Sequence, residues 1–154
     1  MKIVLVGHKG GALDQAQNRI KEVFPEEELT FLFRSGEEHI FREIQAAQPD
    51  LLITEDLEGF EMSTLTDAVT YNLLHCRQLH LLLRDPAMLP AYADGRRPAD
   101  LLSRQLSLVM FFYVRGAEVL QRLKEQAPDL PYAALLPEGD VPDLLPELVR
   151  QVLA

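Results

Sequence analysis

The sequence is poor in several features that identify common protein classes. Its 154 residues include one cysteine, Cys76, which excludes an internal disulfide and a cysteine-based zinc site and suits a reducing compartment. No stretch reaches about 18 apolar residues, and the apolar run in MKIVLVGHKGG is too short for a signal peptide or a membrane span. We therefore expect a cytoplasmic protein without a membrane segment.

Basic residues are also scarce. The chain has 15 Lys and Arg against 24 Asp and Glu, which gives a formal net charge of −9. A long polyanion would meet a repulsive average field on such a protein. We therefore expect no nucleic-acid partner.

The remaining composition is that of an ordinary globular protein. Apolar residues make up 47% of the chain and charged residues 25%, a balance that predicts a packed core rather than disorder. A length of 154 residues suits one domain. We expect a single domain over residues 1–154.

Apolar strands and amphipathic helices alternate along the chain. A continuous apolar run at 3–6 predicts a strand buried on both faces, and Leu13, Ala16 and Ile20 then share one helical face. The same patterns predict further strands at 29–33, about 51–54, about 79–83, 106–114 and 132–137, and further helices after SGEE at 35–38, at 63–78, 98–105 and 116–126, and after Asp140. The strand at 106–114 is the most apolar, so we expect it in the middle of the sheet.

This alternation predicts the fold class. Strands that alternate with helices form a parallel sheet covered by helices, wound through right-handed crossovers. We expect an α/β, three-layer Rossmann-like or flavodoxin-like fold with a mainly parallel sheet of about five to six strands and helices on both faces. Residues 85–105 interrupt the pattern with Pro and Gly and are interpreted as a long loop or insertion.

The fold class also predicts where a ligand binds. In such sheets ligands bind beyond the carboxyl ends of the strands, where the strand order reverses. The turn GHKGG after the first strand offers flexible glycines, a cation and the free N–H groups of a helix start, which together favour a phosphate or carboxylate. The candidate ligand-binding residues at this edge are Gly7, His8, Lys9, Gly10, Gly11, Arg34, Ser35, Glu55, Asp56, Arg84 and Arg115.

The turn carries no complete phosphate-binding motif. Lys9 and Ala12 break the G-x-G-x-x-G pattern, and the G-K-[ST] ending of a P-loop is missing. The alternative interpretation is a plain strand-to-helix turn with a solvated Lys9.

Two clusters of polar residues are candidates for a catalytic site or a metal site. The segment TEDLEGFE offers carboxylates for a divalent cation or for acid–base work, but we favour the interpretation as a solvated acidic loop near a helix N-terminus. His75, Cys76 and His80 are close in sequence, yet we expect Cys76 on the apolar face of a helix as a core residue and His80 in or beside the fourth strand, pointing elsewhere. We predict no catalytic residue and no metal site, and the cofactor stays unknown.

The segment PDLLITEDLEGFE is similar to the third strand and following loop of response-regulator receiver domains. On that alignment Glu55 replaces the phosphorylated aspartate. GHKG stands where the family has an acidic pair, and Val114 and Arg115 end the fifth strand without the family's Lys-Pro. The resemblance therefore implies a pseudo-receiver that signals without phosphorylation, with dimerisation through a helical face as its output.

A second resemblance covers more of the chain. The glycine-rich turn after strand one, PDLLIT, and the late segment GAEVLQRLKEQAPDLPYAALLPEG are similar to the N-terminal Rossmann-like half of GT-B-type glycosyltransferases. That family binds its nucleotide-sugar mainly in a C-terminal domain, which this sequence does not contain. The resemblance implies that Gly10, Gly11 and the loop after strand three face an acceptor cleft, with Arg84 and Arg115 as anion contacts.

Three functional hypotheses follow. The first is a non-catalytic Rossmann-like module that binds a small anionic ligand or a protein partner at the carboxyl edge of its sheet. The second is a glycosyltransferase-like transferase component that works with a partner subunit, and the third is the pseudo-receiver. A homodimer is compatible with the first and third.

Overall fold

A parallel β-sheet runs through the described part of the chain. The computed structural model describes residues 1–33, 40–55, 76–83, 110–126, 132–135 and 141–153. Six strands lie in the order β2-β1-β3-β4-β5-β6, and all five pairings are parallel. The strands are β1 (Lys2–Gly7), β2 (Glu28–Phe33), β3 (Leu51–Glu55), β4 (Arg77–Leu82), β5 (Met110–Arg115) and β6 (Tyr132–Leu135).

The strand order places a reversal between β1 and β3. The chain runs from β1 to β2 on one side and then returns to build β3, β4, β5 and β6 on the other. The first five strands have the flavodoxin-like order 2-1-3-4-5, in which ligands bind at the β1/β3 switch point. The predicted α/β fold with a parallel sheet is confirmed.

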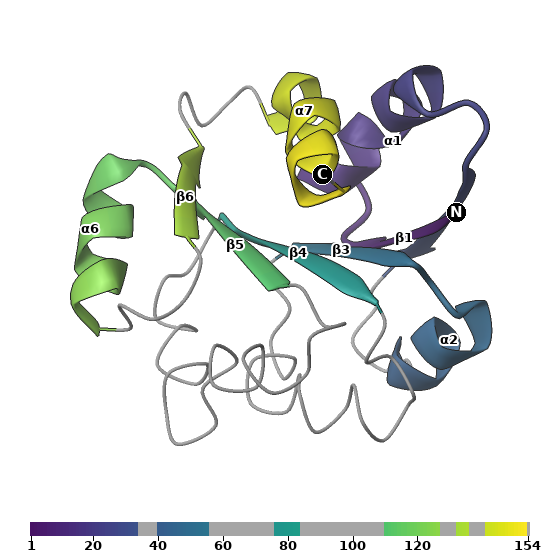
Figure 1. Cartoon of the computed structure of the whole chain (residues 1–154), viewed down its shortest axis with the longest axis horizontal. Coiled ribbons are helices and arrows are strands. Elements are labelled where there is room, and N and C mark those ends of the chain that lie inside the picture. Colours follow the sequence, from purple (N-terminus) through teal and green to yellow (C-terminus); the bar gives the residue numbers. More distant parts are fainter. Residues whose placement is uncertain (34–39, 56–75, 84–109, 127–131, 136–140, 154) are drawn as a thin grey trace.

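Helices cover both faces of the sheet (Figure 1). The helices of the described ranges are α1 (Ala12–Val23), α2 (Ile40–Ala47), α6 (Ala117–Gln126) and α7 (Val141–Leu153). α1 and α7 lie together on one face, α2 lies on the opposite face, and α6 lies beside β5 and β6. The predicted three-layer arrangement is therefore also confirmed.

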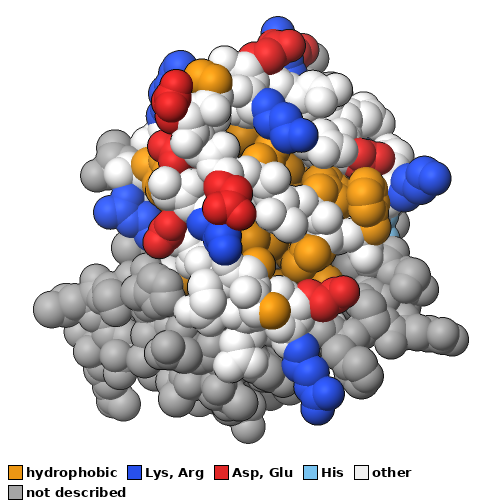
Figure 2. Space-filling view, turned by 90° about the vertical axis from the view of Figure 1, so that its right-hand side faces the viewer, with side chains coloured by type: hydrophobic (Ala, Val, Ile, Leu, Met, Phe, Trp, Pro, Cys, Tyr) orange, Lys and Arg blue, Asp and Glu red, His pale blue; other side chains and the backbone are white. Residues whose placement is uncertain are grey.

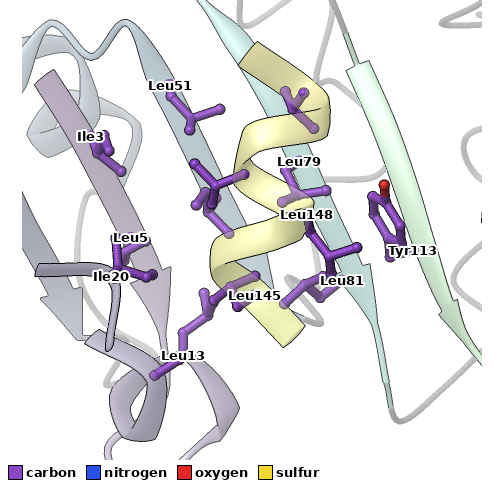
Figure 3. Packing of buried hydrophobic residues seen from close by; sticks show 14 of the residues in the cluster. Ile3, Leu5, Leu13, Ile20, Leu51, Leu79, Leu81, Tyr113, Leu145 and Leu148 are labelled. Carbon is purple, nitrogen blue, oxygen red and sulfur yellow. The ribbon is translucent and has the colours of Figure 1, made fainter. Parts of the chain in front are cut away.

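The larger core lies under α1 and α7. Leu145 and Leu148 of α7 pack with Leu79 and Leu81 of β4 in one apolar cluster (Figure 3). Each fully buried Leu or Ile stabilises the fold by about 1.5–3 kcal/mol relative to an exposed one. Consecutive residues of β1 alternate between this cluster and a smaller one under α2, so β1 is buried on both faces as predicted.

Three sequence-based boundaries and positions differ in the structure. β4 begins at Arg77, so the helix predicted over 63–78 was wrong at its end. Cys76 is buried as predicted, but it directly precedes β4 and packs with Val4 and Val6 instead of lying on a helix. Among the described strands β3 and β4, not β5, are the middle ones, because there β6 alone extends the sheet beyond β5.

β4 begins with a charged residue, Arg77, whose side chain has hydrogen-bond partners there. Its Nη1 donates hydrogen bonds to the carbonyl oxygens of Val152 (3.1 Å) and Leu153 (2.6 Å) at the end of α7. The last carbonyls of a helix lack partners within the helix, and a cation there is also favoured by the helix dipole. The SGEE capping box, residues 63–75 of the predicted third helix, the predicted 98–105 helix and the 85–105 loop lie outside the described residues.

The end of α2 holds a strained residue that predicts a stabilising substitution. Gln48 has a φ of 49°, a left-handed conformation that costs an ordinary residue about 1–2 kcal/mol and glycine almost nothing. Gln48→Gly also loses the 2.6 Å bond from Gln48 Nε2 to the Gln45 carbonyl oxygen and gains unfolded-state entropy. We expect urea denaturation to show a net gain of about 0.5 kcal/mol. A loss of stability would mean that the side-chain bond outweighs the strain.

Candidate functional site

The carboxyl ends of β1 and β3 meet at the glycine-rich turn. β1 ends at Gly7, the turn follows, and α1 begins after Gly11. β3 ends at Glu55, whose side chain is only 3% exposed although it is charged. The site at the switch point is therefore built from the turn and one carboxylate that arrives from the neighbouring strand.

Glu55 binds the turn through both of its oxygens. Oε1 accepts a hydrogen bond from the backbone N–H of His8 at 2.8 Å, and Oε2 accepts one from the backbone N–H of Leu13 at 3.1 Å. Leu13 is in the first turn of α1, where N–H groups have no partner inside the helix. Gly11, the N-cap residue, has no side chain to cap them. The Glu55 carboxylate, at the end of β3, therefore caps the N-terminus of α1.

The glycines make room for this carboxylate. A Cβ atom built on Gly7 would lie 2.7 Å from Glu55 Oε1, and one built on Gly11 would clash with the same oxygen. The parallel register that sets Val6 beside Thr54 brings Glu55 to this place. Two of the three glycines in the turn are thus explained by the approach of a side chain of the protein itself.

A second carboxylate completes the turn. Asp14 Oδ2 accepts a hydrogen bond from the N–H of Gly10 at 2.7 Å, and the N–H of Gly11 donates to the carbonyl oxygen of His8 at 2.9 Å. Gly10 has a φ of 76°, which favours glycine. Two carboxylates therefore lie at the positive end of the α1 dipole, where negative charge is stabilising.

The sequence-predicted site residues fall into three groups. The five turn residues and Glu55 are brought together, with Lys9 and Gly10 exposed and His8 half-buried. Arg115 is exposed at the end of β5, three strands from β1 or roughly 14 Å along the sheet, and its Nη1 donates to the Leu83 carbonyl oxygen at 3.4 Å. Arg34, Ser35, Asp56 and Arg84 lie outside the described residues.

A buried polar cluster occupies the other face of the sheet. His80 Nδ1 lies 2.6 Å from Thr54 Oγ1, and His80 Nε2 lies 3.0 Å from Gln78 Oε1. Because a carbonyl oxygen only accepts, Nε2 carries the proton and Nδ1 accepts from the Thr54 hydroxyl. Burial lowers the pKa of His80 to about 3, so the imidazole is neutral at physiological pH.

Burial also decides the chemistry of the one cysteine. Desolvation raises the pKa of the Cys76 thiol to about 12, whereas a nucleophile or metal ligand needs the thiolate. The Sγ atom donates to the Arg77 carbonyl oxygen at 3.3 Å. Cys76 is therefore a packing residue. His80 is hydrogen-bonded to Thr54 and Gln78. His75 lies outside the described residues.

Sequence reasoning missed the partners that give these groups their roles. The role of Asp14 could have been found in the sequence, because acidic residues are favoured in the first turn of a helix, where Asp14 lies. Pairing of Thr54 with His80 has no such signal, because it depends on the register between β3 and β4.

The described ranges contain neither a metal-ligand cluster nor a membrane-spanning helix. In that part of the chain no three His, Cys, Asp or Glu side chains converge as metal ligands. None of the described helices combines the length and apolar character needed to cross a membrane.

No family model matches the chain, and no curated protein and no solved structure is significantly similar to it.

Proposed function

We propose that the chain is a non-catalytic flavodoxin-like module of the pseudo-receiver kind, which binds a protein partner at the carboxyl edge of its sheet. One observation carries the proposal. The Glu55 carboxylate fills the place at the β1/β3 switch point where a ligand anion would bind in this fold. The chain supplies its own anion there.

Three N–H donors of the turn that would favour a bound phosphate are already in use. The N–H groups of His8, Gly10 and Leu13 donate to the carboxylates of Glu55 and Asp14. A phosphate in the turn would have to displace these bonds and would then lie within a few ångströms of two like charges. At about 4 Å such a repulsion costs roughly 4 kcal/mol near a protein surface. This favours a protein partner over a phosphate held inside the turn.

The strand order supports the receiver-like resemblance over the glycosyltransferase-like one. The first five strands follow 2-1-3-4-5, whereas the dinucleotide-binding Rossmann order is 3-2-1-4-5-6. On the receiver alignment Glu55 takes the position of the phosphorylated residue, and here both of its oxygens are hydrogen-bonded to backbone. An engaged carboxylate suits a module that works without phosphotransfer.

A small anionic ligand is the second candidate, because Lys9 and Gly10 lie exposed at the tip of the turn. A Cβ atom built on Gly10 would meet nothing within 4 Å. An anion on the outside of the turn could contact Lys9 without displacing Glu55. The transferase hypothesis rests on the sequence resemblance.

A charge reversal tests the partner-binding face. We expect Lys9→Glu to abolish capture of partner proteins from the source cells, because Lys9 is exposed at the proposed face. Lys21→Glu is the matched control, since Lys21 is exposed in the last turn of α1, at the opposite edge of the sheet. Capture that is lost in both variants or kept in both would contradict the proposed face.

A thermal-shift screen separates the two candidates. We expect inorganic phosphate, nucleotides, nucleotide-sugars and sugar phosphates to leave the Tm of the wild type unchanged. A ligand at about 100 times its Kd would instead stabilise by roughly 2.7 kcal/mol and raise Tm by a few degrees. A shift that Lys9→Ala removes would overturn the proposal in favour of the anionic ligand.

A further inference from the structure

Among the described strands, β2 lies at one end of the sheet. β2 pairs with β1 on one side, and no strand in the described ranges pairs with its other side. This edge lies on the side of the molecule shown in Figure 2, where hydrophobic side chains reach the surface in patches among charged ones. This edge is a different surface from the proposed binding face, which lies at the carboxyl ends of the strands.

The hydrogen-bonding phase of β2 follows from two backbone contacts. The N–H of Glu28 donates to the carbonyl oxygen of Met1, and the N–H of Asp50 donates to that of Lys2. Alternate residues of a strand direct their backbone groups to opposite sides. Glu28, Thr30 and Leu32 therefore bond to β1, while the N–H and C=O groups of Leu29, Phe31 and Phe33 point outward.

The side chains of this edge are mostly apolar and partly exposed. Phe33 is 47% exposed, and its ring lies 4.3 Å from that of Phe31 between centroids. Leu29, Thr30 and Leu32 are half-buried. From Leu29 to Phe33 the strand has no charge and no proline, although such an open edge is a template for pairing with another chain.

The opposite edge of the sheet is different. β6 has only four residues, and the sequence places Pro131 directly before it and Pro137 two residues after it. A short strand bounded by prolines is a common protection against edge pairing. β2 has six residues and neither device.

We propose that β2 binds β2 of a second copy of this chain in antiparallel orientation, centred on Phe31, so that the two sheets become continuous. A two-fold axis through Phe31 sets Leu29 opposite Phe33 of the partner subunit. All three outward-facing residues then form hydrogen-bonded pairs in one register. A shift by one residue would set outward groups against inward ones and lose these bonds.

Three properties of β2 favour a second copy over another partner. Phe31 is the middle one of the three outward residues, so a two-fold axis there pairs every outward residue of β2 with an outward residue of the second copy. Phe31 and Phe33 have side chains on the same face, so two copies would bring four aromatic rings together. The charged residue of the strand, Glu28, lies at one end, far from its equivalent in the antiparallel partner.

Engineered cysteines test the register. Directly opposed residues in a hydrogen-bonded pair have Cα atoms about 5.5 Å apart, within the range of a disulfide. We therefore expect Phe31→Cys to give a cross-linked dimer under mild oxidation. Leu29→Cys is the matched control, because the two copies of residue 29 would lie about 13 Å apart. The native Cys76 is buried and is shared by all variants.

A mixing experiment keeps the test valid if Phe31→Cys does not fold. We expect neither Leu29→Cys nor Phe33→Cys to cross-link alone, while their mixture gives a cross-linked heterodimer. Cross-linking of Leu29→Cys alone, or none in the mixture, would overturn the register.

Sedimentation equilibrium tests the dimer itself. We expect the wild type to dimerise at micromolar concentration and Phe33→Glu to raise the dimer Kd at least about tenfold, since it sets a charge in the apolar pairing. Ala117→Glu, an equivalent change at an exposed position of α6, should leave the Kd unchanged. A monomeric wild type, or an equal effect of both substitutions, would overturn the proposal.

Discussion

Glu55→Ala is expected to lower the free energy of unfolding by about 3 kcal/mol, because it leaves two backbone donors of the turn without their acceptor. Those donors are the N–H groups of His8 and Leu13, and the space that the side chain vacates is buried. Urea denaturation of both proteins measures the difference. Asp14→Ala is the matched control, and it should cost about 1 kcal/mol because Asp14 makes an exposed bond.

Anions should restore part of the stability that Glu55→Ala loses. Formate or acetate fits the vacated place and offers the same carboxylate oxygens to the free N–H groups. A small anion held by a few N–H groups binds weakly, so we would use about 50–100 mM formate. We expect it to raise the Tm of Glu55→Ala by a few degrees and to leave the Tm of the wild type unchanged. Chloride at equal ionic strength controls for screening.

The glycines give an independent check on the same contact. Gly11→Ala should destabilise the wild type by about 2 kcal/mol, because the new Cβ would clash with Glu55 Oε1. In the Glu55→Ala background the same substitution should cost much less, which a double-mutant cycle detects. Additive costs and no effect of formate would mean that Glu55 does not hold the turn.

Acid should destabilise the protein through His80. Its pKa is about 3 in the folded protein and about 6.5 when unfolded. Between these values the unfolded chain binds a proton that the folded protein does not, so stability is complete above pH 6.5 and falls as the pH drops. Well below pH 6.5 the loss is about 1.4 kcal/mol per pH unit, and it reaches roughly 2.7 kcal/mol in total by pH 4.5.

Two substitutions isolate the His80 contribution. His80→Gln removes the titrating group, so the dependence of unfolding free energy on pH should weaken by about one proton in this window. Thr54→Ser keeps both the imidazole and the hydroxyl that donates to Nδ1, and it should retain the wild-type slope. An unchanged slope in His80→Gln would show that other groups cause the acid loss.

Much of the fold could be predicted from local patterns. The apolar run at 3–6 and the spacing of Leu13, Ala16 and Ile20 predicted a buried strand and a following helix, and both are present. These patterns are readable because burial in a strand or helix repeats every two or 3.6 residues. The end of the third helix was misplaced, since CRQLHLL mixes polar and apolar residues that fit β4 as well.

The position of the site was also predictable, but its content was not. A glycine-rich turn after the first strand of an α/β sheet indicates the ligand-binding edge, and Glu55 was among the residues expected there. That the carboxylate itself fills the turn depends on β3 lying beside β1, which brings Glu55 to His8, 47 residues away in the sequence. No local pattern encodes this contact.

Local sequence alone thus determined the alternation of strands and helices, the buried first strand and the edge at which a site would form, because each depends on neighbours a few residues apart. Only the tertiary structure decided that Glu55 occupies the turn, that Thr54 meets His80 and that β2 lies outermost beside β1 among the described strands. Those contacts depend on strand order and register, which are set by the packing of the whole sheet.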